Sequence, residues 1–276
     1  MSNPPFSILG LIAGSGVYPL LMARGARAAG VQRIVAAAFE GETDPALADC
    51  VDEIEWTMMG KLGKLVKIFA SRGIRHAVMA GQVAPSHLFN LRPDLKALIA
   101  LARLKERNAE SLFGAVADEL GKAGVEIISA TSFMDEHLAC SGVFAGPRLS
   151  SREEEDIAFG FQIAKEISRL DIGQTVVVKK GTVLAVEGFD GTNATIRRGG
   201  ALGKGKSTVV KVSKPNQDFR FDVPVIGPTT LEIAAESYIR TIAVEAGRLL
   251  VLDRERVNEL AKRHGITLFG IDATAA

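Results

Sequence analysis

A short apolar run that ends in a glycine loop and leads directly into a helical pattern sets the first limit on this fold. Residues 8–13 read ILGLIA, Gly14-Ser15-Gly16 follows, and residues 18–29 show helical spacing with Pro19 in the first turn. Strand and helix must approach each other closely at such a loop, which glycine allows. The loop also aims backbone N–H groups and the positive end of a helix at a place where an anion could bind.

The same alternation of strand and helix continues through the first half of the chain. Strands are predicted at residues 33–39, 76–80 and 125–129, and helices at residues 60–72, 85–105 and 109–123. This alternation is typical of a doubly wound parallel sheet. In such sheets ligands collect at the carboxyl ends of the strands, so we expect Gly14 and the Gly81-Gln82 pair to face the same crevice.

The chain is long enough for two domains, and its character changes near the middle. It has 276 residues, of which 47% are hydrophobic and 24% charged, as in a globular protein with a substantial core. Residues 134–152 contain glycines, a proline and serines with little periodicity, which indicates a linker. We therefore expect a Rossmann-like parallel α/β domain in residues 1–133, a second, mixed α/β domain in residues 153–276, and a ligand cleft between them.

The second half mixes helices with β-branched runs. A helix is predicted from Ser151 to Leu170, and the runs 175–178 and 183–186, joined at Lys180-Gly181, predict a β-hairpin. Glycine and lysine alternate in residues 199–206, which indicates a mobile loop whose lysines could contact anionic groups.

Residues 209–230 concentrate the chemistry of the second domain. A β-branched run leads into Lys211, Lys214 and Gln217, which are donors of the kind that bind phosphate. Asp222 then stands between two apolar residues and ahead of two prolines, which predicts a partly dry carboxylate on stiff backbone. Such a carboxylate suits a catalytic role, and the alternative is an edge strand whose charges face water.

Other polar residues lie where predicted strands end or helices begin. Glu187 closes the second hairpin strand, and Asp190, Gly191 and Thr192 precede a helix, where they suit a ligand but also match ordinary turn and cap chemistry. The candidate substrate-binding residues are Gly14, Ser15, Gly16, Gly81, Gln82, Gln174, Glu187, Asp190, Gly191, Thr192, Lys211, Lys214 and Gln217.

The net charge limits the class of binding partner, and the cysteines limit the redox compartment of the cell. The formal net charge is only +1, so the overall charge of the chain does not favour binding of nucleic acid. Cys50 and Cys140 lack the spacing of a metal site, which favours a reducing compartment. No signal-peptide pattern is present, and we expect a cytoplasmic protein. A mean hydropathy of +0.18 fits either an apolar cleft or a peripheral membrane contact.

Two other functional classes are compatible with parts of this pattern. Gly14 and Gly16, with Glu40 after the second strand, suggest a nucleotide-dependent oxidoreductase on the N-terminal sheet, but Pro19 stands where the dinucleotide motif has its third glycine. That class also leaves Lys211 and Asp222 unexplained. A two-lobed lipid or nucleotide carrier without turnover would use the same cleft and the same cations.

Seven segments together resemble one known family. They are GLIAGSGVYP (10–19), AGQV (80–83), RLDIGQ (169–174), LAVEGFDGT (184–192), the Arg197-Arg198 pair, KPNQDFRFDVPVIG (214–227) and EAGRLLVLDRE (245–255). Across nearly the whole chain they look like the LpxI-type UDP-2,3-diacylglucosamine pyrophosphatases of lipid A biosynthesis. The chain departs from the family at residues 105–112, where KERNAESL replaces a frequent acidic pair, so we assign no metal role there.

The resemblance implies a substrate, a cofactor and a catalytic residue. It implies that a lipid-nucleotide substrate lies between two domains and is hydrolysed, with Mg²⁺, to UMP and 2,3-diacylglucosamine 1-phosphate. Asp222 falls where the family has its essential aspartate, and we expect it either to hold Mg²⁺ or to act as base toward the attacking water. A peripheral contact with the cytoplasmic face of the inner membrane and a homodimer are both left open.

Overall fold

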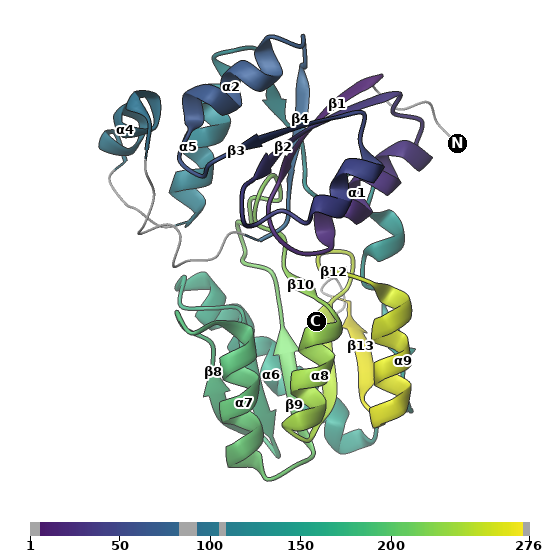
Figure 1. The fold of residues 1–276 in the computed structure, drawn as a ribbon. Helices are drawn as coiled ribbons and strands as arrows, with labels where there is room; N and C mark the ends of the chain where they lie inside the picture. Colours follow the sequence, from purple (N-terminus) through teal and green to yellow (C-terminus); the bar gives the residue numbers. More distant parts are fainter. Residues whose placement is uncertain (1–5, 83–92, 105–108, 273–276) are drawn as a thin grey trace. The chain divides into compact units, whose positions relative to one another are not determined.

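The computed structural model describes residues 6–82, 93–104 and 109–272, and the chain divides into two compact units (Figure 1). The N-terminal unit consists of Met1–Asp135 together with Asp218–Asp222, and the C-terminal unit consists of Glu136–Gln217 together with Val223–Ala276. The chain therefore returns to the N-terminal unit for a short segment that ends at Asp222. The predicted division assigned all of residues 153–276 to the second domain and did not include this return.

The N-terminal unit is built on a parallel sheet of five strands. They are β1 (Ile8–Ala13), β2 (Arg33–Phe39), β3 (Glu53–Thr57), β4 (His76–Ala80) and β5 (Glu126–Ile127), in the order β3-β2-β1-β4-β5. All neighbours pair in parallel, which confirms the predicted parallel α/β fold. Because the strand order reverses between β1 and β4, their carboxyl ends mark the place where such sheets collect ligands.

Helices cover both faces of this sheet, as the alternating pattern predicted. They are α1 (Tyr18–Ala28), the 3₁₀ helix η1 (Pro45–Cys50), α2 (Leu62–Ala70), α4 (Leu95–Ala102) and α5 (Ala109–Gly121). One core cluster joins α2, α4 and α5 to the sheet through Phe69, Ala97 and Leu120. Figure 1 shows α1 on the other side of the sheet.

The edge strand β3 was not predicted from the sequence. Glu53 and Glu55 alternate in it with Ile54 and Trp56, so few of its residues are apolar. The two glutamates form ion pairs with Arg72, whose Nε lies 2.7 Å from Glu53 Oε2 and whose Nη2 lies 2.5 Å from Glu55 Oε1. An edge strand with charged side chains has a weak hydrophobic signal, which explains why the pattern missed it.

The C-terminal unit contains a mixed sheet of six strands. They are β6 (Gly142–Ala145), β7 (Thr175–Lys179), β8 (Thr182–Val186), β9 (Ser207–Lys211), β11 (Ile239–Glu245) and β13 (Thr267–Ile271), in the order β6-β13-β11-β9-β7-β8. The central strands β13, β11 and β9 are parallel, whereas β6, β7 and β8 each pair antiparallel. The predicted hairpin is confirmed as β7-β8. A separate parallel pair consists of β10 (Val225–Ile226) and β12 (Leu250–Val251).

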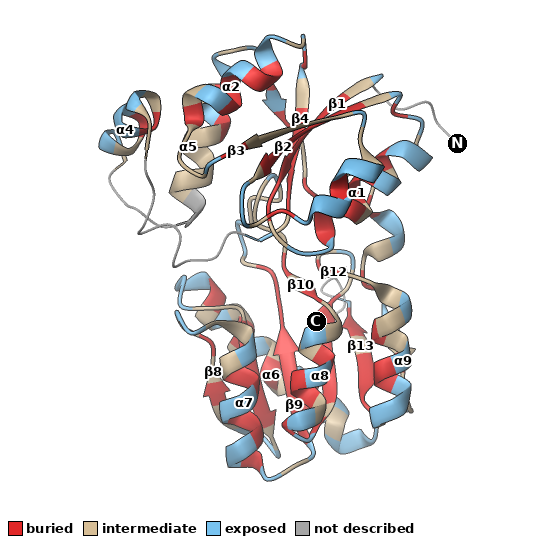
Figure 2. Cartoon of the chain, viewed as in Figure 1, coloured by how far each residue is buried: buried red, intermediate tan, exposed pale blue. Residues whose placement is uncertain are grey.

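Helices on both faces of the six-stranded sheet complete three layers. The helix α6 (Ser151–Arg169) packs on one face through Ile157 and Ala164. The helices α7 (Gly191–Gly203), α8 (Pro228–Glu236) and α9 (Arg254–His264) pack on the other face through Ile196, Leu231 and Val257. Figure 2 shows that buried residues concentrate in the strands between these layers.

The predicted linker, residues 134–152, contains a strand of the C-terminal sheet. It holds η2 (Asp135–His137) and β6, and β6 pairs antiparallel with β13. One of the glycines that suggested a linker, Gly146, is packed closely: a Cβ there would lie 2.0 Å from Ile266 O. Gly146 also has a φ of +80°, a conformation that favours glycine.

The predicted mobile loop at residues 199–206 is mostly helix, because α7 continues to Gly203. Gly199 and Gly200 are buried there: a Cβ on Gly199 would lie 2.4 Å from Val177 Cβ, and one on Gly200 would lie 2.4 Å from Ser237 O. These glycines therefore allow α7 to pack tightly against β7 and the end of α8.

Gly199→Ala is expected to lower the free energy of unfolding by about 1–3 kcal/mol, since the added methyl group overpacks the contact with Val177. Gly114→Ala on α5 is the matched control, because a Cβ there meets no described atom within 4 Å. The control is expected to raise stability by up to about 1 kcal/mol. Denaturant unfolding measures both variants, and equal stabilities would contradict the close packing of α7.

Candidate active site

Several candidate residues meet at one edge of the C-terminal sheet. Lys211 is the last residue of β9, Gln174 precedes β7, Glu187 follows β8, and Thr192 lies in the first turn of α7. Because β7 runs antiparallel to both β8 and β9, its first residue, Thr175, pairs with Lys211 and accepts a hydrogen bond from Glu187 N at 2.9 Å. Strand topology therefore brings these residues together.

The hydroxyl of Thr192 connects a cation and a carboxylate at this edge. Lys211 Nζ donates to Thr192 Oγ1 at 2.9 Å, and Thr192 Oγ1 donates to Glu187 Oε1 at 2.8 Å. Lys211 Nζ also donates to Val225 O at 3.1 Å, and Gln174 N donates to Glu187 Oε2 at 3.1 Å. Lys211 and Glu187 are each 8% exposed, so these hydrogen bonds act at low local dielectric and hold the lysine in one position.

The amino end of α7 adds further positive potential beside Thr192. Asp190 occupies the cap position, where its Oδ1 accepts from Gly188 N at 3.2 Å and its Oδ2 from Arg198 Nη2 at 2.9 Å. The Gly188 N–H, aided by the Arg198 guanidinium, holds the pKa of Asp190 below its usual range. Asp190 therefore stays ionised and links Gly188, ahead of the helix, to Arg198 of α7.

The buried carboxylate of Glu245 anchors the loop that follows β9. Glu245 is 2% exposed at the end of β11, and its Oε2 accepts from both Ser213 N and Ser213 Oγ at 2.8 Å. Lys165 Nζ lies 3.3 Å from the same carboxylate, and Arg248 Nε donates to Ser213 Oγ at 2.9 Å. This network fixes the loop immediately before Lys214.

Lys214 and Gln217 shape the same loop. Lys214 N donates to Gln217 Oε1 at 2.8 Å, so this side chain closes a turn of its own loop. The Lys214 ammonium forms an ion pair with Asp171. The two predicted residues are thus held in defined positions in the loop that leaves the sheet at Lys211.

The segment Asp218–Asp222 is fixed on the N-terminal unit. Ala130 N, three residues after the end of β5, donates to Phe219 O at 2.7 Å. The ring of Phe221 packs against Phe113 of α5, with 6.0 Å between the ring centroids, and it joins the core of that unit. Backbone and ring contacts together hold this segment.

Asp222 ends this segment as a half-buried carboxylate. Its backbone N donates to Asp218 O at 3.0 Å, and the Asp218 side chain accepts from Arg220 N at 3.0 Å. Hydrogen bonds from the Arg220 guanidinium hold the pKa of Asp218 below its usual range, which keeps this ion pair charged at neutral pH. Asp222 therefore has the partly buried position on fixed backbone that the sequence predicted.

The predicted meeting of two strand ends is present in the N-terminal unit. Gly14 N donates to Ala80 O at 2.8 Å, and Ser15 and Gln82 exchange backbone hydrogen bonds of 2.9 and 3.0 Å. A Cβ on Gly81 would lie 2.7 Å from Gly14 C, so glycine lets the ends of β1 and β4 touch. The N–H groups of Gly14 and Ser15 are thus used within the fold, which corrects the idea that they aim at an anion.

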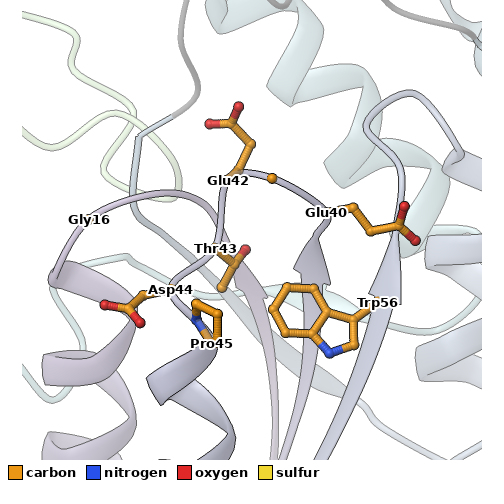
Figure 3. Close-up of a pocket in the computed structure, with 8 residues that line it drawn as sticks. Gly16, Glu40, Glu42, Thr43, Asp44, Pro45 and Trp56 are labelled. Atoms are coloured by element: carbon orange, nitrogen blue, oxygen red, sulfur yellow. The ribbon is translucent and has the colours of Figure 1, made fainter.

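Gly16 lines an open pocket of about 660 Å³ in the N-terminal unit (Figure 3). The other residues that line it are Glu40, Gly41, Glu42, Thr43, Asp44, Pro45 and Trp56. Thr43 Oγ1 donates to Ala13 O at 2.5 Å and ties this wall to the end of β1. Figure 3 shows the three carboxylates pointing in different directions. Their charge disfavours a diphosphate and favours a neutral group rich in hydroxyls.

Sequence reasoning identified Gly16 and Glu40 of this pocket and missed the other lining residues. Asp44 and Pro45 carried a usable signal, because an aspartate before proline after a strand is typical of a helix start. Trp56, the single tryptophan of the chain, was missed together with β3.

Few side chains in the described ranges could together hold Mg²⁺. In residues 6–82, 93–104 and 109–272 no three Asp, Glu, His or Cys side chains are grouped closely enough to hold a metal ion. Mg²⁺ commonly uses only one or two carboxylates and completes its octahedral coordination with substrate phosphate oxygens and water. The half-buried Asp222 fits such a site.

The candidates thus fall into two groups. The C-terminal unit contains Gln174, Glu187, Asp190, Gly191, Thr192, Lys211, Lys214 and Gln217. The N-terminal unit contains Gly14, Ser15, Gly16, Gly81, Gln82 and Asp222. Gln174 Oε1 is buried and has no hydrogen-bond partner in the described part of the chain. A buried acceptor of this kind needs a donor, which a water molecule or a group on a ligand can supply.

Comparisons with known proteins cover both units. The model of the LpxI N-terminal domain matches residues 8–137, and the model of the LpxI C-terminal domain matches residues 140–269. A relative from Caulobacter vibrioides, named UDP-2,3-diacylglucosamine pyrophosphatase LpxI, is 35% identical over 275 residues. This match spans 96% of the present chain and 97% of the relative.

Proposed function

The chain belongs to the LpxI family, and from this membership we propose that it hydrolyses the diphosphate of UDP-2,3-diacylglucosamine to UMP and 2,3-diacylglucosamine 1-phosphate in lipid A biosynthesis. The observation that carries the proposal is the match of both LpxI domains, in order, to one chain. The arrangement of charge in the two units supports it and suggests a role for each candidate residue.

We assign the diphosphate to the edge of the C-terminal sheet. Its negative charges repel an attacking water, so hydrolysis needs positive groups near the non-bridging oxygens. Lys211, Lys214 and the amino end of α7 provide such groups. Thr192 and Glu187 hold Lys211 in place, and Gln174 Oε1 is an acceptor for a hydroxyl or N–H of the substrate.

We assign the catalytic role to Asp222. In the reaction the oxygen of water bonds to one phosphorus, the bond from that phosphorus to the bridging oxygen breaks, and the bridging oxygen leaves on the other phosphate. The Asp222 carboxylate orients this water and accepts its proton, or it holds Mg²⁺. When bound, Mg²⁺ would offset negative charge on the diphosphate oxygens.

We assign the uridine to the N-terminal unit, near the strand ends at Gly16 and Gly81. The pocket beside Gly16 repels phosphate but suits a neutral nucleoside. Glu40 follows β2, the position from which an acidic residue accepts hydrogen bonds from ribose hydroxyls in parallel α/β folds. Trp56 offers an aromatic surface in the same pocket.

The test is release of UMP from UDP-2,3-diacylglucosamine dispersed in detergent. With Mg²⁺ present we expect turnover, and we expect EDTA to lower the rate about tenfold or more, with recovery when excess Mg²⁺ is added. Binding of the substrate without UMP release would instead support a carrier. Saturable micromolar binding of NAD or NADP would support the oxidoreductase.

Location and assembly stay predictions. None of the helices in the described ranges is both long and apolar enough to cross a bilayer. A cytoplasmic location, a peripheral contact with the inner membrane and a homodimer are untested expectations, and fractionation and light scattering would address them.

A further inference from the structure

Helix α4 exposes three large apolar side chains on one of its faces. Leu95, Leu98 and Ile99 are 73%, 51% and 47% exposed, and Ala102 is exposed as well. These residues recur at the spacing of one helical face. The opposite face consists of small residues, such as Ala97 and Ala100, which are buried in the core. The distribution is the reverse of that on an ordinary surface helix, where the apolar face is the buried one.

Polar contacts hold α4 in this orientation. Asp94 caps the helix by accepting from Ala97 N at 2.9 Å, and it also accepts from Gly63 N of α2 at 2.8 Å. Lys96 Nζ lies 3.5 Å from Glu119 Oε2 of α5. The helix is therefore attached to α2 and α5 at defined points, and its leucines are presented outward.

Basic residues accompany the exposed apolar face. Arg103 is exposed at the end of the helix, about one turn beyond Ile99 and two turns beyond Leu95, and the Lys96 side chain is 41% exposed. In the sequence, residues 92–107 contain five basic and two acidic residues. An apolar face bordered by cations complements a surface with anionic headgroups above hydrocarbon. It complements a second copy of the same positive face poorly, because like charges would meet.

We propose that the face formed by Leu95, Leu98, Ile99 and Ala102 of α4, with Arg103, binds the surface of an anionic bilayer. The helix has 8 residues, so it lies in the headgroup region and does not span the membrane. This inference rests on the proposed function in one respect, since a diacylated substrate resides in a membrane. The contact brings the protein to the surface that holds that substrate.

The test is cosedimentation of the full chain with vesicles that contain no substrate. We expect binding to vesicles of phosphatidylglycerol and phosphatidylcholine, and little binding to phosphatidylcholine alone. A Leu95→Asp, Leu98→Asp double variant is expected to lower the bound fraction about tenfold or more. Leu202→Asp, at a leucine of α7 that is 65% exposed, is the matched control and is expected to bind like the parent protein.

Further measurements separate the other outcomes. Both positions are exposed, so the double variant is expected to keep the parent melting temperature and its UMP release from detergent-dispersed substrate. Unchanged vesicle binding in the double variant, or no binding by the parent protein, overturns the proposal. Light scattering that shows a dimer lost in the double variant, with vesicle binding retained, would assign the face to a second copy. Vesicle binding without UMP release would leave this inference standing and refute the proposed function.

Discussion

Asp222→Asn is expected to lower kcat for UMP release about a thousandfold or more, with little change in KM. The amide keeps the size of the side chain but can neither accept a proton nor hold a cation well, so the loss falls mainly on the transition state. The fold is expected to survive, because the segment is held by Phe219 O and the ring of Phe221 and not by the Asp222 side chain alone. Steady-state kinetics and a melting curve measure both effects.

Asp218→Asn is the matched control for this experiment. Asp218 lies in the same segment, but its carboxylate is occupied by Arg220 at 2.6 Å. Removing its charge weakens a local ion pair and is expected to change kcat less than about tenfold. Its effect on stability is expected above the ordinary carboxyl pKa and should fade as pH falls through the lowered pKa of Asp218. If Asp222→Asn turned over as fast as Asp218→Asn, Asp222 would have no part in the mechanism.

The sheet architecture followed from local patterns wherever a strand was apolar. The strands β1, β2 and β4 are buried runs, and the parallel fold followed from their alternation with helices. The edge strands β3 and β6 were not predicted, because they are only partly buried and lack a continuous apolar run. Periodicity detects a buried face, so it loses power where a strand has one neighbour and charged or small side chains.

Glycine has two structural uses that local sequence does not separate. The glycines of residues 199–206 predicted a mobile loop, whereas Gly199 and Gly200 lie where α7 approaches Val177 and Ser237 too closely for a side chain. A sequence does not show which of these two uses applies, because the deciding contact comes from residues distant in the chain.

The candidate site was predictable residue by residue but not as an arrangement. Glu187 and Thr192 were identified because they lie where a strand ends or a helix starts, and Lys211 was identified as a phosphate-type donor beside a β-branched run. That they share hydrogen bonds depends on β7 lying between β8 and β9, which is a property of topology. The return of residues 218–222 to the N-terminal unit likewise depends on the packing of Phe221 against Phe113 in the core of that unit. Neither pairing has a local signature.

Lys211→Met is expected to lower kcat/KM for UMP release about a hundredfold or more. Methionine keeps the length of the apolar stem and removes the positive charge that we assign to the diphosphate, a loss comparable to removing one donor from a preorganised anion site. The change also removes hydrogen bonds to Thr192 and Val225 O, so a lower melting temperature is expected as well. A loss of activity alone would therefore not distinguish electrostatic from structural damage.

Lys179→Met separates the two causes. Lys179 ends β7 at the opposite edge of the same sheet, and its Nζ donates to Gly203 O and Gly205 O. Its replacement costs a similar pair of partly buried hydrogen bonds, so we expect a comparable drop in melting temperature with kcat/KM within about threefold of the parent. If both variants lost activity in proportion to their stability, Lys211 would be a structural tie between β9 and α7. A loss confined to Lys211→Met at matched stability would place the positive charge of Lys211 in the reaction.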